Sequence, residues 1–73
     1  IMKYPEHYFP YAFHDDQRFA LPEYCQTINH GKALVNHAIV NGRSCILVHR
    51  ETGKIIDGYR GGQAIAFRDN YID

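Results

Sequence analysis

Asn41-Gly42 divides the sequence into two parts whose apolar residues recur with different periods. From Pro22 to Val40, the apolar residues recur every three or four positions, which is the period of an amphipathic helix. After Gly42, three short segments rich in β-branched and apolar residues are separated by glycine-containing turns, which is typical of strands. The sequence therefore predicts an α+β fold. One long or broken helix, residues 22–40, packs on a three-stranded antiparallel β-meander, residues 44–68.

The two ends of the predicted helix carry residues that suit helix termini. Pro22 fits the first helical position, and Glu23 fits the positive end of the helix dipole. Asn41-Gly42 is also a strong hairpin signal, but residues 33–40 do not alternate as a strand would. We therefore expect Asn41-Gly42 to cap the helix in a left-handed conformation.

We expect the helix and the strands to share one hydrophobic core. Gly31 either breaks the helix or lets another element approach it closely. Cys25 and Cys45 lie in apolar segments, so we expect both to be buried and reduced. The predicted core residues are Tyr24, Ile28, Leu34, Val35 and Ile39 from the helix, with Ile46, Val48, Ile56 and Phe67 from the strands.

An aromatic-rich segment, residues 1–20, precedes the helix. Pro5 and Pro10 restrict the residues before them to extended geometry, so we expect an irregular, extended arm. One alternative is that the arm lies across the core as a strap or an edge strand, because aromatic side chains favour burial. The other is that it forms an exposed contact surface, since exposed aromatic clusters mark interfaces. The interface candidates are Tyr4, Tyr8, Phe9, Tyr11 and Phe13, together with Tyr59 and Arg60 from the strand region.

Size and charge limit the classes of function. The chain has 73 residues, which fits a single domain with a small core that a partner chain would help to stabilise. Eight basic residues balance eight acidic residues, which disfavours a dedicated nucleic-acid binder and favours self-association or a protein partner. We find no membrane-spanning stretch and no signal-like segment, so we expect a cytoplasmic protein without membrane contact. Met2 follows Ile1, and we expect Met2 to be the natural start of a small complete protein.

The residues that carry most chemistry are not spaced for a known type of site. His30 and His37 are seven positions apart, so a helix would separate them by about 10 Å, too far to share one metal ion. His14-Asp15-Asp16 would need further metal ligands from elsewhere, and no cysteine or histidine pair has zinc spacing. Cys45 and His49 would lie about 13 Å apart along one strand, so they do not form a catalytic dyad. We therefore predict no metal, no cofactor and no catalytic residue.

The segment Cys45–Ala64, CILVHRETGKIIDGYRGGQA, resembles a local signature of the ParB-type nuclease and sulfiredoxin superfamily. In that superfamily, a strand ends in a glycine–x–x–arginine type of turn that binds phosphate or nucleotide groups, and a helix follows. The resemblance implies that Gly58 is the turn glycine and that Arg60 contacts phosphate. Gly61 stands where the superfamily usually has its arginine.

The same glycines allow two interpretations by physical argument alone. Gly58, Gly61 and Gly62 leave backbone amides accessible beside the guanidinium of Arg60, and this combination can form an anion-binding nest. Alternatively, the glycines relieve a bulge and a tight turn in a twisted sheet, which is the interpretation that we favour. Arg60 would then pair or stack with a neighbour, namely Asp57, Asp69, Tyr59 or Tyr71.

These observations favour binding without chemistry. We expect a small non-enzymatic accessory or regulatory protein that acts by protein–protein binding, of the bacterial or phage modulator type. The first alternative is a phosphate- or nucleotide-handling domain that uses the turn at residues 57–61. The second alternative is a nucleic-acid binder that uses the basic and aromatic face of the strands. The residues that carry this second alternative are Arg43, Arg50, Lys54, Arg60 and Arg68, with Tyr59 and Phe67.

Overall fold

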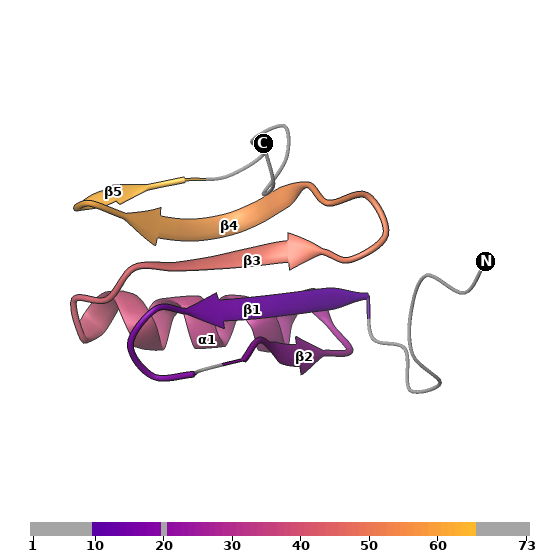
Figure 1. Ribbon diagram of the computed structural model, residues 1–73, viewed down its shortest axis with the longest axis horizontal. Coiled ribbons are helices and arrows are strands. Elements are labelled where there is room, and N and C mark those ends of the chain that lie inside the picture. Colours follow the sequence, from indigo (N-terminus) through magenta and orange to yellow (C-terminus); the bar gives the residue numbers. More distant parts are fainter. Residues whose placement is uncertain (1–9, 20, 66–73) are drawn as a thin grey trace.

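The computed structural model of the protein describes residues 10–19 and 21–65. These residues form one helix and a five-stranded antiparallel sheet (Figure 1). The α+β class predicted from the sequence is therefore confirmed, although the sheet has five strands rather than three. The elements are, in order, β1 (Tyr11–Asp15), β2 (Glu23–Cys25), α1 (Ile28–Val40), β3 (Cys45–His49), β4 (Ile55–Arg60) and β5 (Gln63–Ala64).

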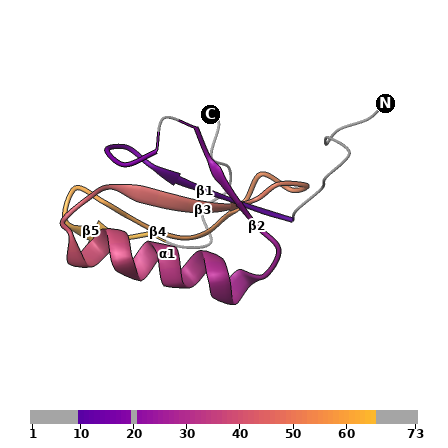
Figure 2. The same ribbon diagram turned by 90° about the horizontal axis from the view of Figure 1, so that it is seen from below.

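The strands lie across the sheet in the order β2-β1-β3-β4-β5, and every neighbouring pair is antiparallel. Because β2 and β3 both run antiparallel to β1, they are parallel to each other, and α1 connects them. A parallel connection needs a crossover, and here the crossover is the helix on one face of the sheet (Figure 2). The other face is therefore left without a helix among the described residues.

The second half of the predicted arm is a strand in the interior of the sheet. Tyr11 of β1 faces Cys25 of β2 on one side and His49 of β3 on the other. The prediction of an irregular arm or an edge strand is thus wrong for residues 11–15, because β1 forms ladders with β2 on one side and with β3 on the other. The candidates Tyr4, Tyr8 and Phe9 lie outside the described residues.

The helix begins later than predicted. Its N-cap is Thr27, whose Oγ1 accepts a hydrogen bond from the backbone N–H of His30 at 3.2 Å. The residues Glu23–Cys25, predicted as the first helical turn, form β2 instead. Pro22 is compatible with both arrangements, because proline also suits the start of an edge strand. The threonine was therefore the better signal for the start of the helix.

The helix ends as predicted at Asn41-Gly42. Gly42 has a left-handed φ of 68°, and its N–H donates to the carbonyl of Ile39 at 2.9 Å. The N–H of Arg43 donates to the carbonyl of Ala38 at 3.0 Å, which completes a Schellman motif. The chain then enters β3 next to the end of β1.

The described part of the sheet has a hydrophobic cluster on each face. The cluster on the α1 side contains Phe13, Cys25, Val35, Ala38, Cys45 and Leu47. The cluster on the other side contains Ile46, Val48 and Ile55, with Ile65 packed against them. Ile46 and Val48 are buried, as predicted, but the prediction that they share one core with the helix is wrong, because β3 presents Cys45 and Leu47 to α1 instead.

The remaining core predictions have mixed outcomes. Tyr24 lies on β2 and is 42% exposed, so its assignment to the core is wrong. Cys25 and Cys45 are buried and free, as predicted. Phe67 lies outside the described residues. The residues confirmed in or against the cluster on the α1 side are Ile28, Leu34, Val35, Ile39 and Ile56.

The helix approaches the sheet closely at Gly31. A Cβ atom added to Gly31 would lie 2.7 Å from Cδ2 of Leu47, which is closer than side chains pack. Leu47 is fully buried, so it has little room to move away. The helix continues through Gly31 without a break. Of the two predicted roles for this glycine, close approach is therefore confirmed and a helix break is wrong.

Candidate binding site

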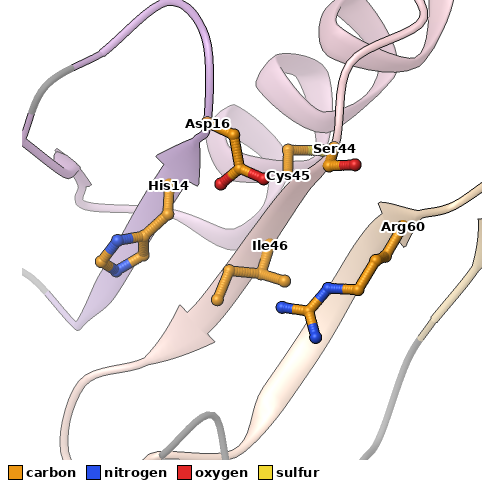
Figure 3. Close-up of a pocket in the computed structure, with 6 residues that line it drawn as sticks. All are labelled: His14, Asp16, Ser44, Cys45, Ile46 and Arg60. Atoms are coloured by element: carbon orange, nitrogen blue, oxygen red, sulfur yellow. The ribbon is translucent and has the colours of Figure 1, made fainter.

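A hollow of about 110 Å³ lies on the sheet face away from α1 (Figure 3). It is located where β1 ends, β3 begins and β4 ends, and we call it the strand-end hollow. Asp16 and Arg60 point toward it from the two sides of β3, and Ile46 lies between them. Its lining residues are His14, Asp16, Ser44, Cys45, Ile46 and Arg60.

Arg60 is the last residue of β4 and is followed by a two-residue hairpin turn. Gly61 and Gly62 have φ values of 58° and 85°, and two successive positive φ angles are what a type I′ turn requires. In Figure 3 the guanidinium of Arg60 extends toward Ile46. None of the ion pairs among the described residues includes Arg60, so the expected pairing with Asp57 is absent.

Gly58 has a packing role within the sheet. It lies opposite Ile46, and an added Cβ would be only 2.7 Å from the carbonyl oxygen of Cys45. Its N–H donates to Oδ1 of Asp57 at 2.8 Å, so this amide is already occupied. The irregularity in the β3–β4 register falls between Leu47 and Val48 rather than at Gly58. Close packing against β3, and not a bulge, therefore explains this glycine.

His14 and Asp16 reach the hollow from the end of β1. The backbone N–H of Asp16 donates to the carbonyl of Ser44 at 3.2 Å, which ties the end of β1 to the start of β3. Burial lowers the pKa of His14 below its ordinary value of 6.5, although the carboxylate of Asp16 acts in the opposite direction. At neutral pH the imidazole is therefore uncharged, and the hollow contains one negative group and one positive group, Asp16 and Arg60.

The buried carboxylate of Asp15 fixes the turn that carries Asp16. Its Oδ1 accepts hydrogen bonds from the backbone N–H groups of Gln17 at 2.9 Å and Arg18 at 3.0 Å. Its Oδ2 accepts from Nη1 of Arg43 at 3.5 Å, which is also an ion pair. Because Asp16 follows Asp15 directly, these bonds hold its backbone at the rim of the strand-end hollow.

The thiol of Cys45 is not activated as a nucleophile. Its side chain belongs to the cluster on the α1 side, so the residue lines the hollow with its backbone. Burial, assisted by the nearby carboxylate of Asp15, raises the pKa of Cys45 from 9.0 to about 11. The thiol therefore stays protonated at neutral pH. The hollow is suited to hydrogen bonding and ion pairing and not to covalent chemistry by this thiol.

A second hollow of about 240 Å³ adjoins the first and shares His14 and Asp16 with it. Leu21 lines the second hollow and is 79% exposed, so it offers apolar surface to a partner. The other lining residues are Asp15, Phe19 and Pro22. Along the two adjoining hollows, a cation lies at the Arg60 end and an apolar side chain lies at the Leu21 end.

Of the interface candidates that the structure describes, Arg60 alone lines the strand-end hollow. Tyr59 packs against the cluster on the α1 side, because successive side chains of a strand face opposite sides. Phe13 is 1% exposed inside that cluster. Tyr11 packs against it and meets the ring of His49 edge-on, with 5.4 Å between ring centroids. The structure therefore does not bring these aromatic side chains together with Arg60.

Sequence reasoning missed His14, Asp16 and Ser44 as members of this site. They meet because β1 pairs with β3, which places His14 opposite Ile46 and Asp15 opposite Cys45. Asp15 and Cys45 are 30 positions apart, so no local pattern signals their pairing. Tyr11–Asp15 does not alternate between apolar and polar residues, so the available local signal was its two aromatic residues, Tyr11 and Phe13, which are common in strands.

Comparison with known proteins found no matching family model, no matching curated protein and no matching solved structure. The resemblance to the ParB and sulfiredoxin superfamily stays a prediction, but one implication is wrong, because strand β5 and not a helix follows the turn at Gly61-Gly62.

Within residues 10–19 and 21–65, no group of three or more His, Cys, Asp or Glu side chains is placed to hold a metal ion. Among the same residues, no helix combines the length and the apolar character that a membrane span needs.

Proposed function

We propose that the protein is a small non-enzymatic accessory or regulatory factor that acts by protein–protein binding through the strand-end hollow. The observation that carries this proposal is the guanidinium of Arg60, which lies at a concave site without an ion-pair partner in the described part of the chain. Arginine is common among the residues that contribute most to protein–protein affinity. A partner side chain that accepts hydrogen bonds from the fork of Arg60 is the ligand that this site fits best.

The size of the hollow supports a protein ligand over a small-molecule substrate. Pockets for drug-sized ligands and cofactors measure about 300–1,000 Å³. The strand-end hollow, at about 110 Å³, has room for one side chain or one small anion. A partner that inserts one residue here would make its other contacts on the surrounding surface, as protein partners do.

The state of the two cysteines supports a cytoplasmic location as part of the same proposal. Both thiols are buried and free, and burial raises the pKa of Cys25 as well as that of Cys45. Free thiols are common in cytoplasmic proteins, whereas small secreted domains usually depend on disulfides.

The test is affinity capture from a cell lysate, followed by mass spectrometry, with the wild type compared with Arg60→Ala and Lys54→Ala. Lys54 is the matched control, because it is an exposed cation in the β3–β4 turn, at the other end of these strands. We expect the same partner to be captured by the wild type and by Lys54→Ala but to be lost with Arg60→Ala. Capture that is unchanged by Arg60→Ala would contradict the proposal.

A second candidate function is the binding of a phosphate group. Arg60 and the hydroxyl of Ser44 line a hollow of anion size, and the Gly61-Gly62 turn directly follows Arg60. Amide NMR titrations with inorganic phosphate, ATP, CTP and a short oligonucleotide distinguish the candidates. Saturable shifts of Gly61 and Gly62 that disappear in Arg60→Ala would favour phosphate binding. Shifts spread over the β face with the oligonucleotide alone would favour nucleic-acid binding.

A further inference from the structure

The strand-end hollow contains two opposite charges that do not pair with each other. Asp16 and Arg60 both point toward it, but no ion pair joins them, and neither takes part in another ion pair among the described residues (Figure 3). His14 lies in the same hollow and is uncharged at neutral pH because burial lowers its pKa. The face therefore offers one cation and one anion to whatever covers it.

A second copy of the same chain is a partner that matches this pattern by symmetry. In a dimer with a two-fold axis, every contact occurs twice. If one residue of the first copy touches a different residue of the second copy, the same two residues also meet with the copies exchanged. An axis through the hollow would place Arg60 of each copy beside Asp16 of the other. Two ion pairs then form, from two side chains of each copy, and no charge is left facing a like charge.

Apolar surface beside the charges adds to such a contact. Exposed ion pairs contribute little on their own, so a stable dimer needs buried apolar area as well. Leu21, which is 79% exposed, lies on the adjoining hollow that shares Asp16 with the first one. A dimer would bury this side chain, and the balance of eight basic and eight acidic residues leaves no net repulsion between two copies.

We propose that the protein forms a symmetric dimer in which Arg60 of each copy pairs with Asp16 of the other across the strand-end hollow. This inference rests on the proposed function, because it names the partner that occupies the hollow. The site is incomplete in a single copy, since each guanidinium receives its carboxylate from the other chain.

Sedimentation equilibrium on charge-reversed variants tests the dimer. We expect the wild type to dimerise at concentrations of about 0.01–1 mM, and Arg60→Glu and Asp16→Arg each to raise the dissociation constant at least about tenfold. The double variant Arg60→Glu/Asp16→Arg restores opposite charges across the axis and should return the constant to within about threefold of the wild type. Lys54→Glu, the matched reversal outside the hollow, should leave it unchanged.

Two further measurements complete the test. Leu21→Ser should weaken the dimer, and high salt should weaken the wild type because exposed charge pairs are screened. Circular dichroism of each variant confirms that it is folded. A wild type that is monomeric throughout this range, or a folded double variant that fails to recover, would overturn the inference. If the wild type is monomeric and Arg60→Ala still loses a captured host protein, the dimer fails but the proposed function stands. If the wild type is monomeric and Arg60→Ala captures the same proteins as the wild type, both the dimer and the proposed function fail.

Discussion

Asp15 is the buried charged residue of the described segments, and it connects three parts of the molecule. Its carboxylate binds two backbone N–H groups of the turn after β1 and the guanidinium of Arg43 after α1. We expect Asp15→Ala to lower the free energy of unfolding by about 2–4 kcal/mol, since it leaves these donors unpaired. Asp16 is the exposed neighbour of Asp15, so Asp16→Ala should change the free energy of unfolding by less than about 0.5 kcal/mol. Urea unfolding measures both, and equal effects would mean that Asp15 is not a structural anchor.

The pKa of His14 leads to a second prediction at the scale of the residue. Because burial lowers its pKa below 6.5, the unfolded chain binds the proton more strongly than the folded chain does. Stability should therefore fall as the pH drops through 6.5 and should level off below the folded-state pKa. The difference in unfolding free energy between the wild type and His14→Gln isolates this effect from the other histidines. If the wild type instead gains stability relative to His14→Gln as the pH falls, the charge of Asp16 outweighs burial in setting the pKa of His14.

Cys45 gives the opposite dependence at alkaline pH. Its pKa rises from 9.0 to about 11 on folding, so the folded chain keeps the proton after the unfolded chain has lost it. The stability that Cys45 contributes should be complete below pH 9.0 and should be lost as the pH rises toward about 11. Cys45→Ala removes the titrating group and should show a flatter profile in urea unfolding. Parallel profiles would contradict the burial of this thiol.

Among the elements, α1 and β3 pack closely where Gly31 meets Leu47. Gly31→Ala should raise intrinsic helix propensity by about 1 kcal/mol, but the added methyl meets Leu47. We expect a net destabilisation of about 1–3 kcal/mol, because Leu47 is fully buried. Leu47→Val shortens the opposing side chain, so the double variant should be more stable than the sum of the single changes. Additive effects in thermal unfolding would show that Gly31 and Leu47 do not touch.

The elements also show how far sequence reasoning reaches. The helix C-terminus and the strands after Gly42 were predictable because their signals, Asn41-Gly42 and Gly61-Gly62, are local. The face that β3 presents to the helix was not predictable. Four successive residues of β3 are apolar and buried, so no alternation of apolar and polar residues marks one face: Cys45, Ile46, Leu47 and Val48. The candidate site was predicted only at Arg60, since the other residues reach it through the pairing of β1 with β3.

At the scale of the whole molecule, a hydrophobic cluster lies on each face of the sheet. Val35 on the α1 side is 0% exposed and Val48 on the other side is 5% exposed. Val35→Ala and Val48→Ala should therefore each cost about 2 kcal/mol of stability. Val40→Ala is the matched control, because Val40 is 84% exposed and its truncation should be nearly neutral. A neutral Val48→Ala in urea unfolding would mean that the face away from α1 contributes little to folding.

The position of β1 also has a consequence for the order in which the chain acquires its structure. β1 is an interior strand between β2 and β3, and its longest pairing is with β3. Asp15 therefore cannot pair with Cys45, nor Tyr11 with His49, until β3 has been synthesised. Contacts of such high sequence separation form late, because a long loop must close first. A ribosome adds about 5–20 residues per second, so β1 is made a few seconds before β3 is available to it. During that interval the edge of β1 that will pair with β3 has no partner, and an unpaired strand edge favours aggregation of the nascent chain.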